Sequence, residues 1–227
     1  MKFFQVKGWI DVGKLGPVIM QGLPPYPLWG IRLPLDSGVR KSLVSQFIEK
    51  RADESWLLIG KETLCSDEQI WIAWLGLQRR KMQDCMRSNS IDGEMLRLLS
   101  GTHHVSAGIK RAGVSESDAE AWIVKIPESE GEGMIPVCEL LQIRETAVEL
   151  AAEISAEITD SRPTPTIEGL IRLQIISPEE VCEFDNGDSV GNDANRVNAD
   201  ADSNGRWSNE EICDLMIASI ATSDLQG

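Results

Sequence analysis

The chain of 227 residues contains two histidines, and they are adjacent. Histidine is the side chain best suited to acid–base and metal chemistry near neutral pH. On a helix, however, His103 and His104 would point about 100° apart. They cannot easily ligate one metal ion or act as an acid–base pair, because a catalytic base needs an aligned partner. A structural role, or a role facing RNA, is the better interpretation of both side chains.

A second candidate for chemistry is an acidic run near the C-terminus that has the spacing D-x-[DN]-x-[DN]-G-x5-E of an EF-hand calcium loop. Its residues are Asp200, Asp202, Asn204, Gly205 and Glu211. The preceding segment 193–199 is not a convincing entering helix, and no second loop pairs with it. We therefore expect no metal site, and a calcium-binding adaptor using this loop remains the alternative function.

Basic side chains gather on three consecutive segments with helical patterns. They are Arg79, Arg80, Lys81, Arg87, Arg97, Lys110 and Arg111. Such a set can be an ordinary solvated helix surface. It can also be a face that contacts phosphates, which is of interest because the rest of the molecule is so acidic.

The motifs of the common catalytic sites are missing. The sequence has no G-x-S-x-G, no H-E-x-x-H, no P-loop and no G-x-G-x-x-G pattern. We therefore expect a protein that is not an enzyme, with no catalytic residues and no cofactor. A small enzyme using a carboxylate pair outside these motifs remains a rival, and it would need a deep acidic pocket.

The charge is distributed unevenly along the chain. The net charge is −14, but residues 1–113 hold 16 Lys and Arg against 11 Asp and Glu, whereas residues 114–227 hold 6 against 25. The acidic half cannot form an electrostatic surface for RNA, whereas the first half can. No apolar run approaches the roughly 18 to 20 residues of a membrane span, so we expect a cytoplasmic protein that binds no membrane.

Five cysteines are spread over the chain with no Cys-x-x-Cys pair. They are Cys65, Cys85, Cys138, Cys182 and Cys213. This spacing argues against a zinc site or a disulfide scaffold. We expect the cysteines to act as small hydrophobic residues.

Hydrophobic periodicity predicts one α+β domain, with a small mixed β-sheet packed against several α-helices. Strands are expected near residues 4–10, 28–33, 55–59 and 121–126, and helices over 38–51, 66–86, 92–99 and 136–158, followed by a helix around Leu170 and Leu173 and one from Ser208. Thr102 is the expected N-cap of a further helix that ends at Gly113. The domain comprises residues 1–184 and 207–227, and the acidic, Asn/Asp-rich segment 185–206 is expected to be a disordered insertion.

The segment 94–124 carries a recognisable pattern: an apolar helix, then Ser100-Gly101, then a helix that ends at Gly113 before an apolar strand. Upstream, residues 58–64 (LIGKETL) supply a Gly-x-Glu-x-Leu element. Together these motifs resemble the kinase-binding regulatory subunit of the KEOPS (EKC) complex, the family of the PRPK-binding protein, in its archaeal form. Thr63 departs from the histidine common in that element, and His103-His104 replace the usual Arg-Gln.

The resemblance implies a non-catalytic subunit that binds and regulates the small atypical serine/threonine kinase/ATPase of a complex that installs threonylcarbamoyladenosine in tRNA. Relatives of this kind also hold the 3′ CCA end of the tRNA. The residues expected at the kinase interface are Ile109, Ala112, Leu215 and Met216, although an apolar stripe equally fits the protein core. The residues expected to bind tRNA are Arg79, Arg80, His103, His104, Lys110 and Arg111.

Overall fold

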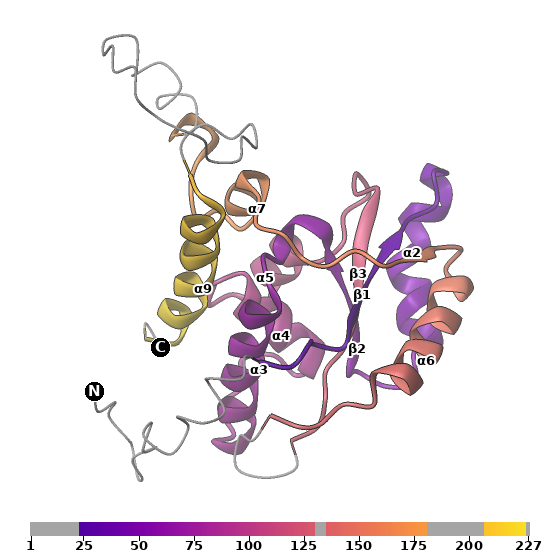
Figure 1. The fold of residues 1–227 in the computed structure, drawn as a ribbon, viewed down its shortest axis with the longest axis horizontal. Coiled ribbons are helices and arrows are strands. Elements are labelled where there is room, and N and C mark those ends of the chain that lie inside the picture. The colour runs from indigo at the N-terminus through magenta and orange to yellow at the C-terminus, as the bar shows by residue number, and fades with distance from the viewer. Residues whose placement is uncertain (1–22, 130–134, 181–206, 226–227) are drawn as a thin grey trace, which may run out of the picture.

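The computed structural model describes residues 23–129, 135–180 and 207–225 (Figure 1). Its sheet contains β1 (Leu28–Arg32), β2 (Trp56–Gly60), β3 (Glu120–Lys125) and β4 (Glu157–Thr159), in the spatial order β2-β3-β1-β4. All three pairings are antiparallel. The predicted α+β class is confirmed. The expectation of a mixed sheet is wrong, because each strand runs opposite to its neighbour. The strand expected near residues 4–10 lies outside the described residues.

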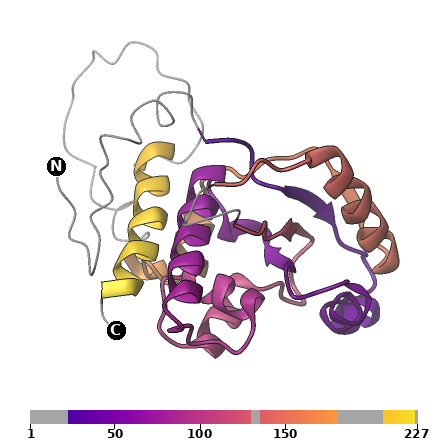
Figure 2. The ribbon, with the colours of Figure 1, turned by 90° about the horizontal axis from the view of Figure 1, so that it is seen from below.

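Helices cover both faces of the sheet (Figures 1 and 2). On one face, Ile31, Leu58 and Ile123 pack against α2 (Ser37–Lys50) and α6 (Leu140–Glu153). The alternate strand residues Trp122 and Val124 face α3 (Asp67–Met82), α4 (Ile91–Leu99) and α5 (Val105–Ala112). Successive strand residues point to opposite faces, so all five residues of β2 are buried.

The helical layer of α3, α4 and α5 follows the predicted order, with corrected ends. Ser66 caps α3 by accepting a hydrogen bond from the backbone N–H of Gln69. This helix ends at Met82 and not near 86. Gly101 has a φ of +61° and turns the chain from α4 into α5. His104 is the N-cap of α5, so the prediction for Thr102 is wrong: its hydroxyl accepts the N–H of His104 in the turn before the helix.

The segment predicted as one helix over 136–158 divides into α6 and β4. Ser155, with a φ of +57°, reverses the chain after Glu153. Ile158 then pairs with Ile31 of β1. The prediction of a helix through Ile158 is therefore wrong, because pairing with the edge of the sheet outweighs the helical spacing of the apolar residues.

The remaining elements form a smaller apolar cluster beside the main core. A short 3-10 helix, η2 (Lys61–Thr63), joins β2 to α3, and α7 (Ile167–Arg172) packs against it. The last helix, α9 (Asn209–Leu225), lies on the outer side of α3, away from the sheet (Figure 2). Residues 185–206, expected to be disordered, lie outside the described residues.

Candidate functional site

A buried ion pair lies beneath the predicted interaction surface. Glu94 and Arg97, one turn apart on α4, are both fully buried. Oε1 of Glu94 accepts hydrogen bonds from Nε (3.1 Å) and Nη2 (2.6 Å) of Arg97. Nη1 of Arg97 donates to the carbonyl of Thr102 at 2.9 Å. The pair therefore ties α4 to the turn that leads into α5.

The second oxygen of Glu94 anchors the loop before α4. It accepts the backbone N–H groups of Arg87 (3.0 Å) and Ser88 (2.9 Å). Burial alone would raise the pKa of Glu94, but the hydrogen bonds from Arg97 and these amides hold it below its ordinary value. Nε of Arg80 lies 3.8 Å from Oε1 of Glu94, and the Arg80 side chain is buried. Arg80, predicted to contact tRNA, is thus an internal partner of Glu94 instead of a surface cation.

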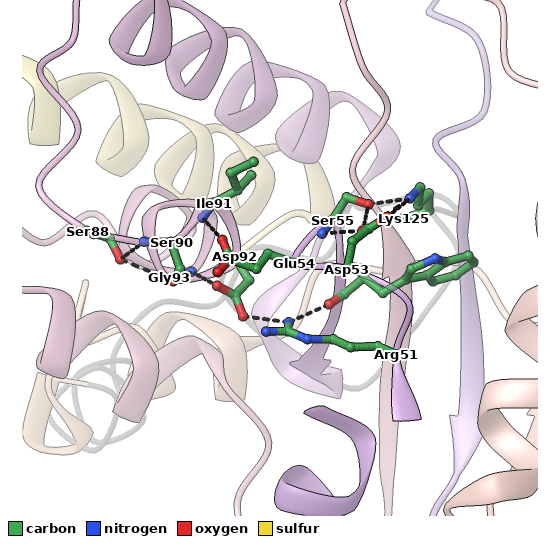
Figure 3. A network of polar contacts seen from close by, with 11 residues as sticks. Arg51, Asp53, Glu54, Ser55, Ser88, Ser90, Ile91, Asp92, Gly93 and Lys125 are labelled. Carbon is green, nitrogen blue, oxygen red and sulfur yellow. Dashed lines mark hydrogen bonds and ion pairs between the residues drawn. The ribbon is translucent and has the colours of Figure 1, made fainter. Parts of the chain in front are cut away.

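A second polar network holds the start of α4 in place (Figure 3). Nη1 of Arg51 contacts the carbonyl of Trp56 (2.7 Å) and Oδ2 of Asp92 (2.6 Å). Oδ1 of Asp92 accepts the N–H of Gly93 at 2.8 Å. Burial raises the pKa of Asp92, whereas hydrogen bonds from Ser90 and Arg51 lower it, and the net effect is a lowered pKa. The network joins the ends of α2, β2 and α4.

Helix α5 packs closely against α4 at Gly108. A Cβ atom at Gly108 would lie 2.6 Å from Cα of Arg97, so the two helices approach more closely than any larger residue permits. Ile109 and Lys110 follow Gly108 around the helix, and their side chains are exposed, as is that of His104 at the start of α5. These three exposed residues are among the predicted site residues.

A shallow hollow of about 300 Å³ opens beside α5. It is lined by Ala107, Lys110, Arg111, Arg172 and Gln174. Nη1 and Nη2 of Arg172 each lie 2.8 Å from one carboxylate oxygen of Asp118. Arg172 also donates to the carbonyls of Arg111 (2.9 Å) and Gly113 (2.6 Å). Asp118 balances the charge of Arg172, so Lys110 and Arg111 give the hollow its positive charge.

The Gly-x-Glu-x-Leu element supports the wall of this hollow. A Cβ atom at Gly60 would lie 2.2 Å from Nη2 of Arg172. A carboxylate oxygen of Glu62 accepts the hydroxyl of Thr166 at 2.8 Å, and Leu64 is buried. The element therefore attaches α7 to the sheet. Arg172 was not predicted from the sequence, because its partner Asp118 lies 54 residues away in the chain.

A model of the family described as kinase binding protein CGI-121 matches residues 38–175, more than half of the chain. The chain belongs to this family. No individual curated protein matches the chain. The matched span runs from α2 through α7, so it includes α4, α5, the Gly-x-Glu-x-Leu element and Arg172. Helix α9 lies outside it.

The four apolar residues predicted at an interface in this CGI-121 family member differ in exposure. Ile109 is 50% exposed. Leu215 is half-buried against the smaller cluster formed with α7. Ala112 and Met216 are completely buried, so these two side chains pack within the protein and present no surface to a partner.

The predicted tRNA residues come from two places in the fold. His103, His104, Lys110 and Arg111 belong to α5 and the turn before it, and Arg79 lies in the last turn of α3. Lys110, His104 and Arg79 are exposed, and His103 is half-buried. Arg79 and His103 each also interact with other groups of the protein. Arg80 is buried, so the exposed basic candidates are Arg79 on α3 and Lys110 on α5, with Arg111 half-buried.

A further apolar surface was not predicted. Helices α2 and α6 expose Val44, Ile48, Leu141 and Val148 on the side away from the sheet, and Leu141 is 84% exposed. Periodicity identified the buried stripe of α6, but it gave no indication that Leu141 and Val148 are exposed among the charged residues on the outer side of the same helix.

One residue of the calcium loop, Glu211, lies within the described residues. Glu211 accepts the N–H (2.8 Å) and the hydroxyl (3.0 Å) of Ser208 and so caps α9. The other four loop residues lie outside the described residues. Within residues 23–129, 135–180 and 207–225, no group of three or more His, Cys, Asp or Glu side chains is placed to hold a metal ion. In the same residues, no helix is long and apolar enough to cross a membrane.

Proposed function

We propose that this CGI-121 family member is a non-catalytic, cytoplasmic subunit of the KEOPS tRNA threonylcarbamoyladenosine-modification complex, in which it binds and regulates the atypical kinase/ATPase and helps to hold the 3′ CCA end of tRNA. The observation that carries the proposal is the match over residues 38–175 to a family of kinase binding proteins. The resemblance of segment 94–124 to the KEOPS subunit supports the finer assignment.

The proposed kinase contact is centred on Ile109, with Leu215 at its edge. Ile109 holds half of its surface in water, and covering an exposed apolar side chain is favourable by about 25 cal/mol per Å². Ala112 and Met216 are buried beneath the contact residues. Ala112 belongs to the main core under α5, and Met216 belongs to the apolar cluster under α9. They position the contact residues and do not meet the partner.

The first experiment is a co-purification of tagged protein from its native host, with and without RNase, followed by mass spectrometry. Recovery of a small atypical kinase in both samples supports the proposal. Recovery of neither kinase nor tRNA refutes it.

A pair of variants tests the surface. Ile109→Asp places a charge at the centre of the proposed contact and is expected to weaken kinase binding by tenfold or more, as at an interface hot spot. Leu141→Asp on α6 is the matched control, because it places the same charge on the other exposed apolar surface. If Leu141→Asp weakens binding and Ile109→Asp does not, the kinase contact belongs to α2 and α6.

The proposed tRNA contact uses the basic residues of α5 and the histidines at its start. Lys110 and Arg111 would contact phosphates, and His103 or His104 would lie near an unstacked base of the single-stranded end, as charged and aromatic groups do in single-strand binding. The acidic C-terminal half would face away, because it repels RNA. Arg80 has no part in this contact, since it is committed to Glu94.

The tRNA contact is tested with Lys110→Glu/Arg111→Glu at several salt concentrations. We expect a several-fold loss of tRNA affinity and a shallower dependence of affinity on salt, because fewer phosphates are neutralised. Lys41→Glu on α2 is the control, since it also reverses an exposed positive charge. Removal of CCA from the tRNA should abolish the difference between wild type and the double variant. Equal losses in the control and the double variant would show a general charge effect and refute the site.

A further inference from the structure

Two cysteines that are 148 positions apart in the chain meet between α3 and α9. Cys65 lies in the turn between η2 and α3, and Cys213 lies on the first turns of α9. Their sulfur atoms are 2.7 Å apart, about 0.7 Å more than the length of a disulfide bond. Both are free thiols. A covalent link between them requires only a small movement of either side chain.

The two thiols differ in access to solvent. Cys65 is 2% exposed and belongs to the apolar cluster of Leu170 and Met216. Cys213 is half-buried, so a small oxidant can reach its sulfur first. This arrangement is typical of a redox pair, in which the accessible cysteine attacks the oxidant and the buried neighbour resolves the mixed disulfide.

The electrostatic surroundings also make Cys213 the attacking thiol. The hydrogen bond from Cys65 lowers the pKa of Cys213 to about 7, against the opposing effect of burial. Ser66 assists this shift, and the carboxylates of Glu68 and Asp214 oppose it. The same hydrogen bond and burial raise the pKa of Cys65. At neutral pH a substantial fraction of Cys213 is therefore the reactive thiolate.

We propose that Cys65 and Cys213 form a reversible dithiol–disulfide site whose oxidant is a small-molecule disulfide such as oxidised glutathione. The Cys213 thiolate attacks one sulfur of the oxidant and breaks its S–S bond, which releases one glutathione. The Cys65 thiol then gives up its proton and attacks the Cys213 sulfur, and the second glutathione leaves with that proton. Two protein thiols are oxidised, and one disulfide is reduced to two thiols.

The link joins α9 to the start of α3. Without it, α9 is attached by the apolar side chains of Ile212, Met216 and Ile220, and by the contact of Ser219 with Gly101. A bond that closes so long a loop restricts the unfolded chain strongly. The oxidised protein should therefore keep α9 in place under conditions that detach it from the reduced protein.

The test uses the purified full chain, incubated with oxidised glutathione at neutral pH, blocked with N-ethylmaleimide and digested for mass spectrometry. We expect a peptide pair linked through Cys65 and Cys213, its loss on reduction with dithiothreitol, and a melting temperature on the order of 10 °C higher in the oxidised protein. This result is independent of the proposed function, because no kinase or tRNA takes part.

Two variants provide the controls. Cys213→Ser should fold like the wild type under reducing conditions and lose both the linked peptide and the gain in melting temperature. Cys85→Ser, which removes an exposed cysteine, should keep both. The same reagent should oxidise the chain unfolded in urea, which shows that the reagent is active. The proposal is overturned if the folded wild type then yields unlinked peptides, or peptides linked through other cysteines.

Discussion

At the scale of single residues, the basic set of the α3–α5 layer divides by burial. Arg80 and Arg97 face Glu94 inside the protein, whereas Lys110 is exposed beside the hollow. A buried charge is tolerated only where a partner and hydrogen bonds replace its water. Residue type alone therefore did not distinguish an internal cation from a surface cation, and the position of Glu94 decides it.

The first prediction concerns this buried pair. Glu94→Gln leaves the charge of Arg97 without a counter-ion in a fully buried site and is expected to lower the free energy of unfolding by about 3 to 5 kcal/mol. Urea denaturation measures the effect. Glu149→Gln, an exposed position on α6, should change the stability by less than about 0.5 kcal/mol. Similar stability of both variants would show that the pair contributes little.

The second prediction concerns pH. The pKa values of Asp92, Glu94 and Asp118 are held below their ordinary values by hydrogen bonds and positive charges that outweigh burial. The unfolded chain therefore binds protons at a pH where the folded chain does not. The contribution of these three carboxylates to the free energy of unfolding should be constant above about pH 5.5 and fall as the pH drops below about 4.5. Denaturation at a series of pH values tests this, and a gain in stability on acidification would contradict it.

At the scale of elements, the position of α5 depends on its close approach to α4. Gly108 lies against the backbone of Arg97, and Gly101 turns the chain between the two helices. Ala112, one turn after Gly108, is buried on the same side of α5, whereas Ile109 and Lys110 are exposed. The close contact at Gly108 therefore decides which side chains of this short helix are buried.

The third prediction follows from that contact. Alanine is the better helix former by about 1 kcal/mol, yet Gly108→Ala should destabilise the protein by about 1 to 3 kcal/mol, because the new Cβ overlaps the backbone of α4. The expected fall in melting temperature is several degrees. Ser106→Ala, an exposed position on the same helix, should leave the melting temperature unchanged or slightly raised. An increase for Gly108→Ala would show that helix propensity outweighs packing here.

At the scale of the whole molecule, three apolar clusters build the described structure, one on each face of the sheet and one between α7 and α9. The third cluster depends on residues on either side of segment 185–206. Leu170 and Leu173 precede it, and Ile212 and Met216 follow it. From these contacts we propose that residues 1–184 and 207–227 fold as one domain.

The fourth prediction tests the role of that segment. Replacement of residues 185–206 by a Gly/Ser segment of equal length should leave the melting temperature and kinase binding unchanged, because the segment offers little apolar surface to bury. Thermal unfolding and the co-purification described above measure the two properties. A fall in stability of several degrees would assign the segment to the folded domain.

Several parts of the fold were predictable from local patterns. Strand β1, the buried β2, the capped start of α3 and the stripe of Ala147 and Ala151 all follow from alternation, capping residues or helical spacing. Ile158 was not predictable in this way, because its apolar side chain fits the helical stripe as well as it fits the edge of the sheet. The antiparallel pairing also depends on which strands become neighbours, and no single strand carries that information.

The sequence by itself determined the α+β class and the family, since both depend on residue types at short spacing. The tertiary structure alone decided that Arg80 is internal, that Ala112 and Met216 are core residues, that Arg172 meets Asp118 and that Cys65 meets Cys213. The reason is physical: burial and partnership depend on distances in space, and contacts between residues far apart in the chain leave no periodic trace in the sequence.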